Sequence, residues 1–371
     1  MDTIKSNSTQ NQAVALAHDS FTQFGGAERV FEAIHELYPS APVYTLLVDK
    51  KLKTQYKFWE FRVTFLQYLY RYTPGLQYLL FLIPLALFFL RPKAHLLLSS
   101  SSSFIRNIHL PKNSIHINYC HTPARFLWMS EGYLDQELPA ILTPIKPLVL
   151  FLVGLIRRWD LRSSKRVTYF IANSAEVQRR IQKYYNRESV VIHPFVNISF
   201  WRPTKPKGDY FLIAGRLHAH KNNELVIEIF NELKWPLHVV GTGRQEEFLR
   251  SIANDNIQFF GKVSDEVLRD EYSGAKGFIY PQLEDFGMMP LEAASCGTAS
   301  IGLAEGGSLE TIIPGVTGEL FEKPDKELIK QQILSWSESK YQQTELISHA
   351  TKFSKENFQA KMKEFIAKVT V

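Results

Sequence analysis

The stretch Gly277-Phe278-Ile279-Tyr280-Pro281-Gln282-Leu283-Glu284-Asp285-Phe286-Gly287-Met288-Met289-Pro290-Leu291-Glu292-Ala293-Ala294 tells most about the fold of this chain. Its first four residues form an apolar strand, and Pro290 favours the first turn of a following helix. Glu284 is then expected on the loop and Glu292 in the first helical turn. The backbone N–H groups of Phe286 to Met289 would be free at the positive helix end, which suits an anionic or polyhydroxylated ligand.

The two glutamates, Glu284 and Glu292, indicate the chemistry of that ligand. An ionised carboxylate only accepts hydrogen bonds, so it binds vicinal sugar hydroxyls well. We expect one carboxylate to hold a sugar and the other a ribose, with a diphosphate between them. A solvated acidic loop ahead of an ordinary helix is the alternative that the spacing alone leaves open.

Apolar strands alternate with helical segments along the whole chain. We expect strands at residues 13–17, 43–48, 95–98, 115–119, 170–172, 190–192, 211–214, 237–240, 257–260 and 277–280. Such alternation predicts parallel sheets, so the fold class is α/β, with two doubly wound Rossmann-like domains facing a cleft. In these folds ligands bind at the carboxyl ends of the strands.

A segment rich in Pro and Lys, residues 197–209, is typical of a linker between domains. We therefore expect one domain over residues 12–203 and a second over residues 204–350. Residues 351–371 form a terminal helix with one apolar stripe, made of Phe358, Met362, Phe365 and Val369. Because such a stripe must pack on something, this helix is expected to cross back to the N-terminal domain.

A basic loop follows the strand at 211–214. Gly215 lets the backbone approach a ligand closely, and Arg216 and Lys221 come next. Arg matches phosphate oxygens in a bidentate way and Lys adds a point charge, so the loop is expected to hold a diphosphate. A solvated basic loop is the alternative. Gly241, in a Gly-Thr-Gly turn after the next strand, is expected close to the nucleotide.

His121 follows the strand at 115–119, in the run Tyr119-Cys120-His121-Thr122-Pro123-Ala124-Arg125. A single His after a strand is more often structural, but the Pro and Arg that follow favour a bond to a transferred sugar or its acceptor. The sequence has no Asp-x-Asp, His-Glu-x-x-His, P-loop or Gly-x-Ser-x-Gly motif. Protein cations and helix ends would then stabilise a leaving diphosphate, and we expect no metal or other cofactor.

Composition narrows the class of protein further. The chain has 371 residues, a net charge of +6 and two cysteines without metal-ligand spacing, which favours a reducing cytoplasm. Residues 1–11 are polar, lack the apolar core of a signal peptide and are expected to be disordered. No basic stripe carries interleaved aromatics, so nucleic acid is not an expected partner.

Lys and Arg residues flank two apolar runs, residues 78–90 and 148–156. Neither run reaches the roughly 20 residues that a spanning helix needs. Two interpretations stay open for them: helices of the core, or a surface that lies on an anionic membrane. The second would place the protein at the inner face of the plasma membrane.

Taken together, these segments resemble the family 4 retaining glycosyltransferases of the two-domain GT-B fold. The resemblance runs from His18 to the terminal helix and is closest to the branch that builds bacterial envelope polysaccharides, O-antigen mannosyltransferases included. The segments that carry it are Gly25-Gly26-Ala27-Glu28-Arg29, Tyr119-Cys120-His121-Thr122-Pro123, Arg157-Arg158-Trp159-Asp160, Ile171-Ala172-Asn173-Ser174, Ala214-Gly215-Arg216-Leu217, Gly241-Thr242-Gly243, Phe260-Gly261-Lys262-Val263, the two glutamates and Gly306-Gly307-Ser308-Leu309-Glu310-Thr311. Gly297-Thr298-Ala299 departs from the family pattern by lacking a Pro.

The resemblance implies roles for these residues. The N-terminal domain would bind the acceptor, with Gly25, Gly26 and His121 on that side. The C-terminal domain would bind the nucleotide sugar through Gly215, Arg216, Lys221, Gly241, Lys262, Val263, Glu284, Phe286, Gly287, Met288, Met289 and Glu292. The residues implied in catalysis are Arg216, Lys221, His121 and Glu284.

The function that the resemblance implies is transfer of a hexose, with retention, from a nucleoside-diphosphate sugar to a glycan or lipid-linked oligosaccharide. Mannose from GDP-mannose is the first donor to consider. Two other functions fit the same fold: a non-hydrolysing nucleotide-sugar epimerase, and a non-catalytic subunit that binds nucleotide sugars or glycans. An epimerase would need acidic residues near His121, and a binding subunit would show degraded motifs. The sequence shows neither an obvious carboxylate pair there nor degraded motifs.

Overall fold

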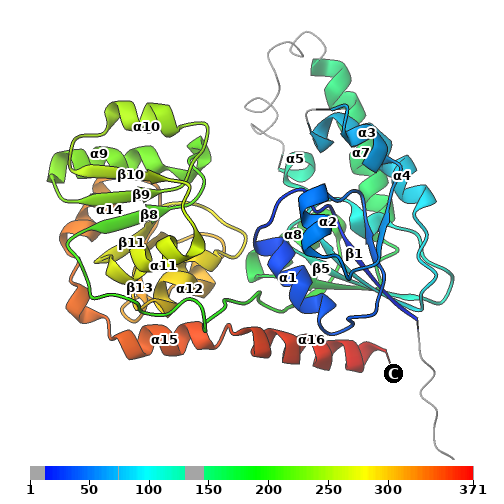
Figure 1. The fold of residues 1–371 in the computed structure, drawn as a ribbon. Helices are drawn as coiled ribbons and strands as arrows, with labels where there is room; N and C mark the ends of the chain where they lie inside the picture. Colours follow the sequence, from blue (N-terminus) through cyan, green and yellow to red (C-terminus); the bar gives the residue numbers. More distant parts are fainter. Residues whose placement is uncertain (1–12, 74, 130–145, 371) are drawn as a thin grey trace, which may run out of the picture. The chain divides into compact units, whose positions relative to one another are not determined.

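The structure, a computed structural model, describes residues 13–73, 75–129 and 146–370. The segment 1–11 that we expected to be disordered lies outside the described residues. Contacts between residues divide the chain into two compact units (Figure 1). The first comprises the chain up to Asn173, Val177–Ile192 and the residues from Met362 on, and the second comprises Ser174–Glu176 and His193–Lys361.

The first unit is built on a seven-stranded, fully parallel sheet of order β3-β2-β1-β4-β5-β6-β7. With seven parallel strands wound outward from β1, the order reverses between β1 and β4, and ligands bind at such switch points in doubly wound folds. The elements are β1 (Val14–His18), α1 (Gly26–His35), β2 (Val43–Thr45), α2 (Lys50–Gln55), β3 (Phe61–Val63), α3 (Leu66–Tyr70), η1 (Leu76–Leu82), α4 (Ile83–Phe89), β4 (Leu96–Ser101), η2 (Ile105–Asn107), β5 (Ile115–Cys120), α5 (Arg125–Trp128), α7 (Lys146–Ser164), β6 (Tyr169–Ala172), α8 (Ala175–Tyr185) and β7 (Ser189–Val191).

The second unit is built on a six-stranded parallel sheet of order β10-β9-β8-β11-β12-β13, whose switch point lies between β8 and β11. This strand order is the Rossmann order counted from β8. The elements are β8 (Phe211–Ala214), η4 (Ala219–Lys221), α9 (Asn223–Leu233), β9 (Leu237–Val240), α10 (Glu246–Ile252), β10 (Ile257–Gly261), α11 (Asp265–Gly274), β11 (Gly277–Tyr280), α12 (Met288–Ser295), β12 (Ser300–Leu303), α13 (Ser308–Thr311), β13 (Gly318–Phe321), α14 (Lys326–Leu334), η5 (Glu338–Lys340) and α15 (Gln343–Thr351). The last helix, α16 (Lys355–Val369), begins in the second unit and belongs to the first from Met362 on.

Both faces of the second sheet are covered, as its sequence requires. Successive strand residues point to opposite faces. Phe211 and Ile213 of β8 therefore join the core under α9 and α14, whereas Leu212 between them joins the core under α11 and α12. A strand buried on both faces must be apolar throughout, which explains the continuous apolar runs that predicted these strands.

The strand expected at residues 43–48 is shorter in the structure, where β2 ends at Thr45. The backbone N–H of Leu46 instead donates to Asp19 O at 3.1 Å, and Leu47 O accepts from the N–H of Phe21 at 3.0 Å. The chain thus leaves the sheet after Thr45 to pair with the loop that follows β1. Since Leu46 to Val48 stay buried, their apolar pattern could not reveal this change.

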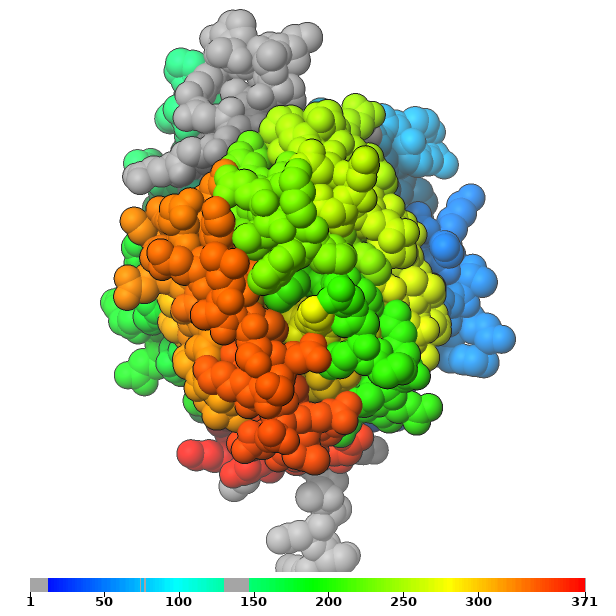
Figure 2. Space-filling model, turned by 90° about the vertical axis from the view of Figure 1, so that its left-hand side faces the viewer, coloured from blue at the N-terminus to red at the C-terminus, as the bar shows by residue number. Residues whose placement is uncertain are grey.

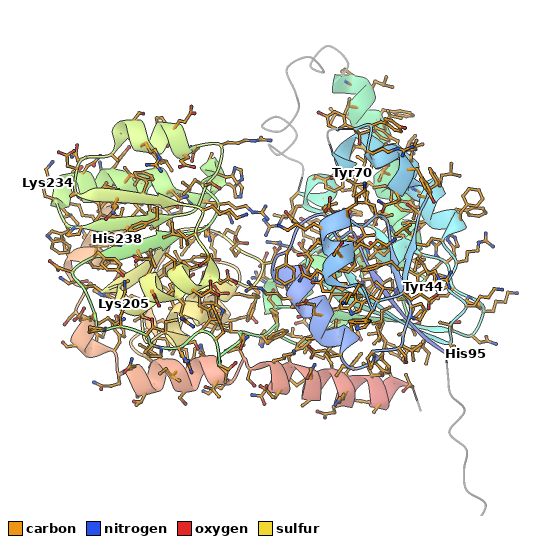
Figure 3. All side chains as sticks on the ribbon, in the orientation of Figure 1. Tyr44, Tyr70, His95, Lys205, Lys234 and His238 are labelled. Atoms are coloured by element: carbon orange, nitrogen blue, oxygen red, sulfur yellow. The ribbon has the colours of Figure 1, made fainter. Side chains whose placement is uncertain are left out.

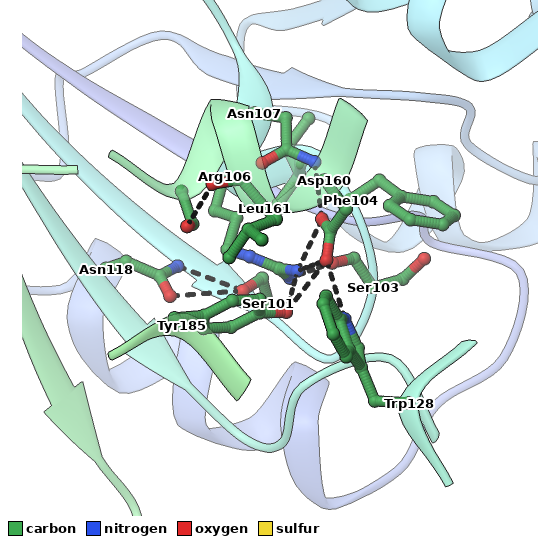
Figure 4. Close-up of polar contacts among 12 residues, drawn as sticks. Ser101, Ser103, Phe104, Arg106, Asn107, Asn118, Trp128, Asp160, Leu161 and Tyr185 are labelled. Atoms are coloured by element: carbon green, nitrogen blue, oxygen red, sulfur yellow. Dashed lines mark hydrogen bonds and ion pairs between the residues drawn. The ribbon is translucent and has the colours of Figure 1, made fainter. Parts of the chain in front are cut away.

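A buried ion pair and the hydrogen bonds to its carboxylate join four elements of the first unit (Figure 4). Arg106 and Asp160 are fully buried, and Arg106 Nη2 lies 2.6 and 2.8 Å from the two carboxylate oxygens. The same carboxylate accepts from Asn107 Nδ2 at 2.8 Å, Trp128 Nε1 at 2.8 Å and Tyr185 Oη at 3.0 Å. Asp160, which the sequence marked only as part of a family-like segment, therefore ties α7 to η2, α5 and α8.

Candidate functional site

The two loops that the sequence singled out meet at the switch point of the second sheet. The first follows β8 and the second follows β11, which is the neighbour of β8. Lys221 Nζ of the first loop forms an ion pair with Glu284 Oε1 of the second, and Asn222 Nδ2 donates to Pro281 O at 2.7 Å. The Lys221 side chain is 9% exposed and that of Glu284 25%. A cation and a carboxylate 63 positions apart thus form one polar cluster.

Arg216 differs from Lys221 in its surroundings. Its side chain is exposed, and no ion pair or hydrogen bond joins its guanidinium to another described residue. Gly215 precedes it with a φ of +122°, and a Cβ built on this glycine would lie 3.5 Å from Met289 Sδ. The loop after β8 therefore passes close to the start of α12 and presents an uncommitted cation there.

The helix after the acidic loop begins two residues earlier than expected. We placed its start near Pro290, but α12 begins at Met288 and its N-cap, Gly287, has a φ of +81°. Glu292 is thus in the second helical turn and not in the first. The backbone amides of Phe286, Gly287, Met288 and Met289 donate no hydrogen bond to the described residues. Unbonded donors at a helix start suit an anionic ligand, and the binding of such a ligand by Phe286 to Met289 stays a prediction.

Glu292 is more enclosed than Glu284, with 6% of its surface exposed. It lies beside Tyr272, and burial, followed by the charge of Glu292, raises the pKa of that tyrosine well above its usual value. Lys262 and Val263 follow β10, with Lys262 exposed and Val263 half-buried. The assigned contacts of these three residues with a ribose and a base stay predictions.

Glycines allow the loops at the carboxyl ends of the second sheet's strands to approach one another closely. Gly241 has a φ of +129°, and a Cβ there would lie 1.8 Å from Gly215 O. Gly307 donates its N–H to Glu284 O at 3.0 Å, and a Cβ on it would lie 1.9 Å from Phe286 O. The loop after β12 thus supports the backbone of the acidic loop. In the sequence, this role of the loop after β12 was indicated only by the family-like segment at residues 306–311.

The close approach at Gly241 leads to a prediction on stability. Gly241→Ala is expected to destabilise the protein by about 2–5 kcal/mol, because overpacking costs about 1–3 kcal/mol and the positive φ about 1–2 kcal/mol. Gly261→Ala is the matched control, since Gly261 also has a positive φ, +64°, but a Cβ there meets nothing within 4 Å. Chemical denaturation of both variants tests this, and equal losses would contradict it.

A second cluster lies at the switch point of the first sheet and contains His121. His121 is 9% exposed, and its Nε2 lies 2.8 Å from Ser100 Oγ at the end of β4. Ser100 Oγ is also 3.2 Å from His18 Nδ1, and His18 Nε2 is 3.5 Å from Glu28 Oε1. Burial, reinforced by His18, lowers the pKa of His121 to about 3, so its imidazole is neutral at physiological pH.

The same cluster reaches the glycine segment that was expected near an acceptor. Gly25 is the N-cap of α1 and donates its N–H to Glu28 Oε2 at 2.8 Å, whereas Gly26 is exposed as the first residue of the helix. Gly25 and His121 are thus linked through Glu28, His18 and Ser100. None of these three linking residues was singled out from the sequence.

Asp19 holds the loop that follows β4. Its carboxylate accepts from the backbone N–H groups of Ser102, Ser103, Phe104 and Ile105 at 2.6, 2.8, 2.9 and 2.9 Å. Four bonds to one buried carboxylate fix the backbone directly after Ser100. Asp19 was likewise missed, because an Asp after a strand is common.

Comparison with known proteins agrees with the fold. Residues 195–353 match the family described as Glycosyl transferases group 1. The D-inositol 3-phosphate glycosyltransferase of Geodermatophilus obscurus is 28% identical over 190 residues, 42% of this chain and 42% of that protein. The O-antigen chain mannosyltransferase RfbU of Salmonella typhimurium is 31% identical over 153 residues, 38% and 43% of the two chains. The chain spans about two fifths of the length of these relatives.

Among solved structures, Anabaena Alr3699/HepE in complex with UDP-glucose superposes with a TM-score of 0.68 at 17% identity. The match covers 96% of this chain and 100% of that chain. The expected fold, two doubly wound domains of the GT-B type, is therefore confirmed. At such a low identity the superposition supports the fold alone, and no substrate or residue role.

Proposed function

We propose that this protein transfers a hexose, with retention, from a nucleoside-diphosphate sugar to a glycan or lipid-linked acceptor, in keeping with the match of residues 195–353 to the group 1 glycosyl transferases. One observation carries the proposal: Lys221 and Glu284 form an ion pair at the switch point, beside unbonded amides at the start of α12. A cation and free amides there suit a diphosphate, and a carboxylate suits a sugar hydroxyl.

The proposed reaction breaks the bond between the anomeric carbon and the diphosphate oxygen. Arg216, Lys221 and the amides from Phe286 to Met289 would stabilise the negative charge that develops on the leaving diphosphate. The acceptor hydroxyl oxygen bonds to the anomeric carbon on the same face, and its proton leaves with the diphosphate. Glu284 would hold the sugar and Glu292 the ribose. His121, on the first unit, would bond a hydroxyl of the sugar or the acceptor.

We propose mannose from GDP-mannose as the donor group, in the synthesis of envelope polysaccharide. This choice is supported by RfbU of Salmonella typhimurium, whose name specifies mannosyl transfer. UDP-glucose is the second donor to test, since the Anabaena protein was solved with it.

The experiment incubates the protein with each sugar nucleotide and a lipid-linked oligosaccharide, and measures released nucleoside diphosphate and the configuration of the new linkage. A product of retained configuration is expected. A new sugar nucleotide without released diphosphate would establish an epimerase instead. A thermal shift with a donor but no turnover would establish a binding subunit.

The first unit presents an apolar surface, which we define as the exposed side chains of η1 and α4: Phe81, Leu82, Leu85, Phe88 and Phe89, which are 38–66% exposed. Leu79, Ile83 and Leu87 of the same segment are buried in the core, and the half-buried Tyr70, which Figure 3 labels, packs against that core. One face of the segment at 78–90 therefore packs in the core, and the other face is exposed, as a membrane-surface segment requires.

We propose that this apolar surface lies on an anionic membrane. Arg91, whose guanidinium lies 4.6 Å from the centre of the Phe88 ring, and Lys93 flank it, and both are exposed. Leu148 and Phe151 of α7 are exposed as well, 54% and 62%. Among the described residues, no helix has the length and hydropathy to cross a bilayer. Apolar side chains beside cations match a membrane interface with acidic lipids.

Changing Leu85, Phe88 and Phe89 together to Ser is expected to weaken binding to anionic vesicles about tenfold or more, because each buried apolar side chain contributes about 1.5–3 kcal/mol. Co-sedimentation with phosphatidylglycerol vesicles measures this. Leu309→Ser with Leu334→Ser is the matched control, as both residues are 52–53% exposed on the second unit. Unchanged sedimentation of the triple variant would contradict the proposal.

A further inference from the structure

The cluster around His121 is a chain of four side chains in which each contact constrains the next. Glu28, His18, Ser100 and His121 lie at 3.5, 3.2 and 2.8 Å from one another in that order. His18 and Ser100 are 2% and 0% exposed, so water does not compete for their hydrogen bonds. His121 Nδ1 makes no hydrogen bond to a described residue.

The positions of the protons on these four side chains follow from Glu28, which is the anionic end of the series. Glu28 carries a negative charge at neutral pH, because its hydrogen bonds and His18 hold its pKa below the usual value despite burial. A nitrogen lone pair facing a carboxylate is repelled, so His18 Nε2 carries a proton. With a single ring proton, held on Nε2, His18 has an acceptor at Nδ1, and the Ser100 hydroxyl must donate to it.

A hydroxyl has one proton, so Ser100 Oγ can only accept at its second contact. The donor there is His121 Nε2–H, which leaves Nδ1 of the neutral imidazole with its lone pair. We infer that Glu28, His18 and Ser100 are positioning residues that fix His121 as the Nε2–H tautomer and make its Nδ1 a hydrogen-bond acceptor. Resting on the proposed function, that nitrogen accepts a hydrogen bond from a sugar hydroxyl.

We call the series Glu28, His18, Ser100 and His121 the relay. Glu28→Gln is expected to reverse the direction of each hydrogen bond in the relay without removing a side chain. The amide oxygen can still accept from Gly25 N–H, which turns the amide NH2 toward His18 Nε2. That nitrogen must then accept, and every proton along the chain moves to the opposite partner. Ser100→Ala instead removes the connection. Ser99→Ala is the matched control, since Ser99 Oγ contacts His116 Nε2 at 2.7 Å in the same sheet without touching the relay.

The experiment records long-range proton–nitrogen correlations of the full chain labelled with [15N]histidine, with His121 assigned by its loss in His121→Gln. At neutral pH the wild type and Ser99→Ala are expected to show His121 as Nε2–H, Glu28→Gln as Nδ1–H and Ser100→Ala as a mixture. An Nδ1–H wild type, or the same tautomer in all folded variants, would overturn the inference. These spectra need no substrate, so failure of sugar transfer is a separate result.

Where transfer is measurable, the relay makes a kinetic prediction as well. Ser100→Ala is expected to lower kcat about tenfold or more with little change in KM for the donor. The reason is that a ring proton on the wrong nitrogen of His121 affects the step in which the sugar reacts, and not the binding of the donor. Ser99→Ala is expected to keep both constants. A fall in donor affinity alone would assign Ser100 a structural role.

Discussion

Replacing Lys221 by Ala is expected to slow sugar transfer by about two to three orders of magnitude, the usual loss when one preorganised donor to a developing charge is removed. Lys221 is buried and lies against Glu284, so its ammonium is held in place before a substrate binds. The protein should stay folded, because the Glu284 side chain is 25% exposed and water can solvate it once Lys221 is gone. Initial rates of nucleoside-diphosphate release measure the effect.

The matched control is Lys276→Ala. Lys276 is also ion-paired in the second unit, with Asp209, but it precedes β11 and so lies at the opposite end of the strand from Glu284. Near wild-type transfer is expected from this variant. Lys221→Arg should recover part of the rate, since it restores the charge with a different shape. Full activity of Lys221→Ala would remove this residue from the catalytic group.

Four of the six strands in the second unit could be predicted from the sequence because local signals bound them, whereas β12 and β13 were not among the expected strands. The strand expected at 211–214 agrees with β8 to the residue, and α9 follows it from Asn223. Here a glycine follows the strand and Asn222 precedes the helix with a φ of +54°. The start of α12 was missed because Gly287, at a positive φ, serves as N-cap without a side chain.

The two polar clusters differ in how far the sequence could reveal them. Arg216, Lys221 and Glu284 follow adjacent strands and carry formal charges, so their residue types and positions are informative. Ser100 and His18 are 82 positions apart, and nothing local connects them. The run of five serines from Ser99 to Ser103 was an available signal, because three of them continue an apolar strand and are buried.

Asp160→Ala is expected to destabilise the protein by about 3–5 kcal/mol, because it leaves Arg106 charged, fully buried and without its counterion. Three further donors, on Asn107, Trp128 and Tyr185, lose the same acceptor. Urea denaturation followed by tryptophan fluorescence reports on this unit through Trp128. Glu60→Ala is the control: its ion pair with Arg62 is exposed, and such pairs contribute about 0–1 kcal/mol.

A double variant separates the cost of the unpaired charge from the cost of lost packing. Arg106→Met removes the cation that Asp160→Ala leaves buried, so the two changes together should cost less than the sum of the single losses. The difference measures how much of the effect is uncompensated charge. If the losses simply add, Asp160 acts mainly by holding Trp128, Asn107 and Tyr185 in place. A loss under about 1 kcal/mol for Asp160→Ala would mean that Arg106 reaches water in solution, contrary to its burial in the structure.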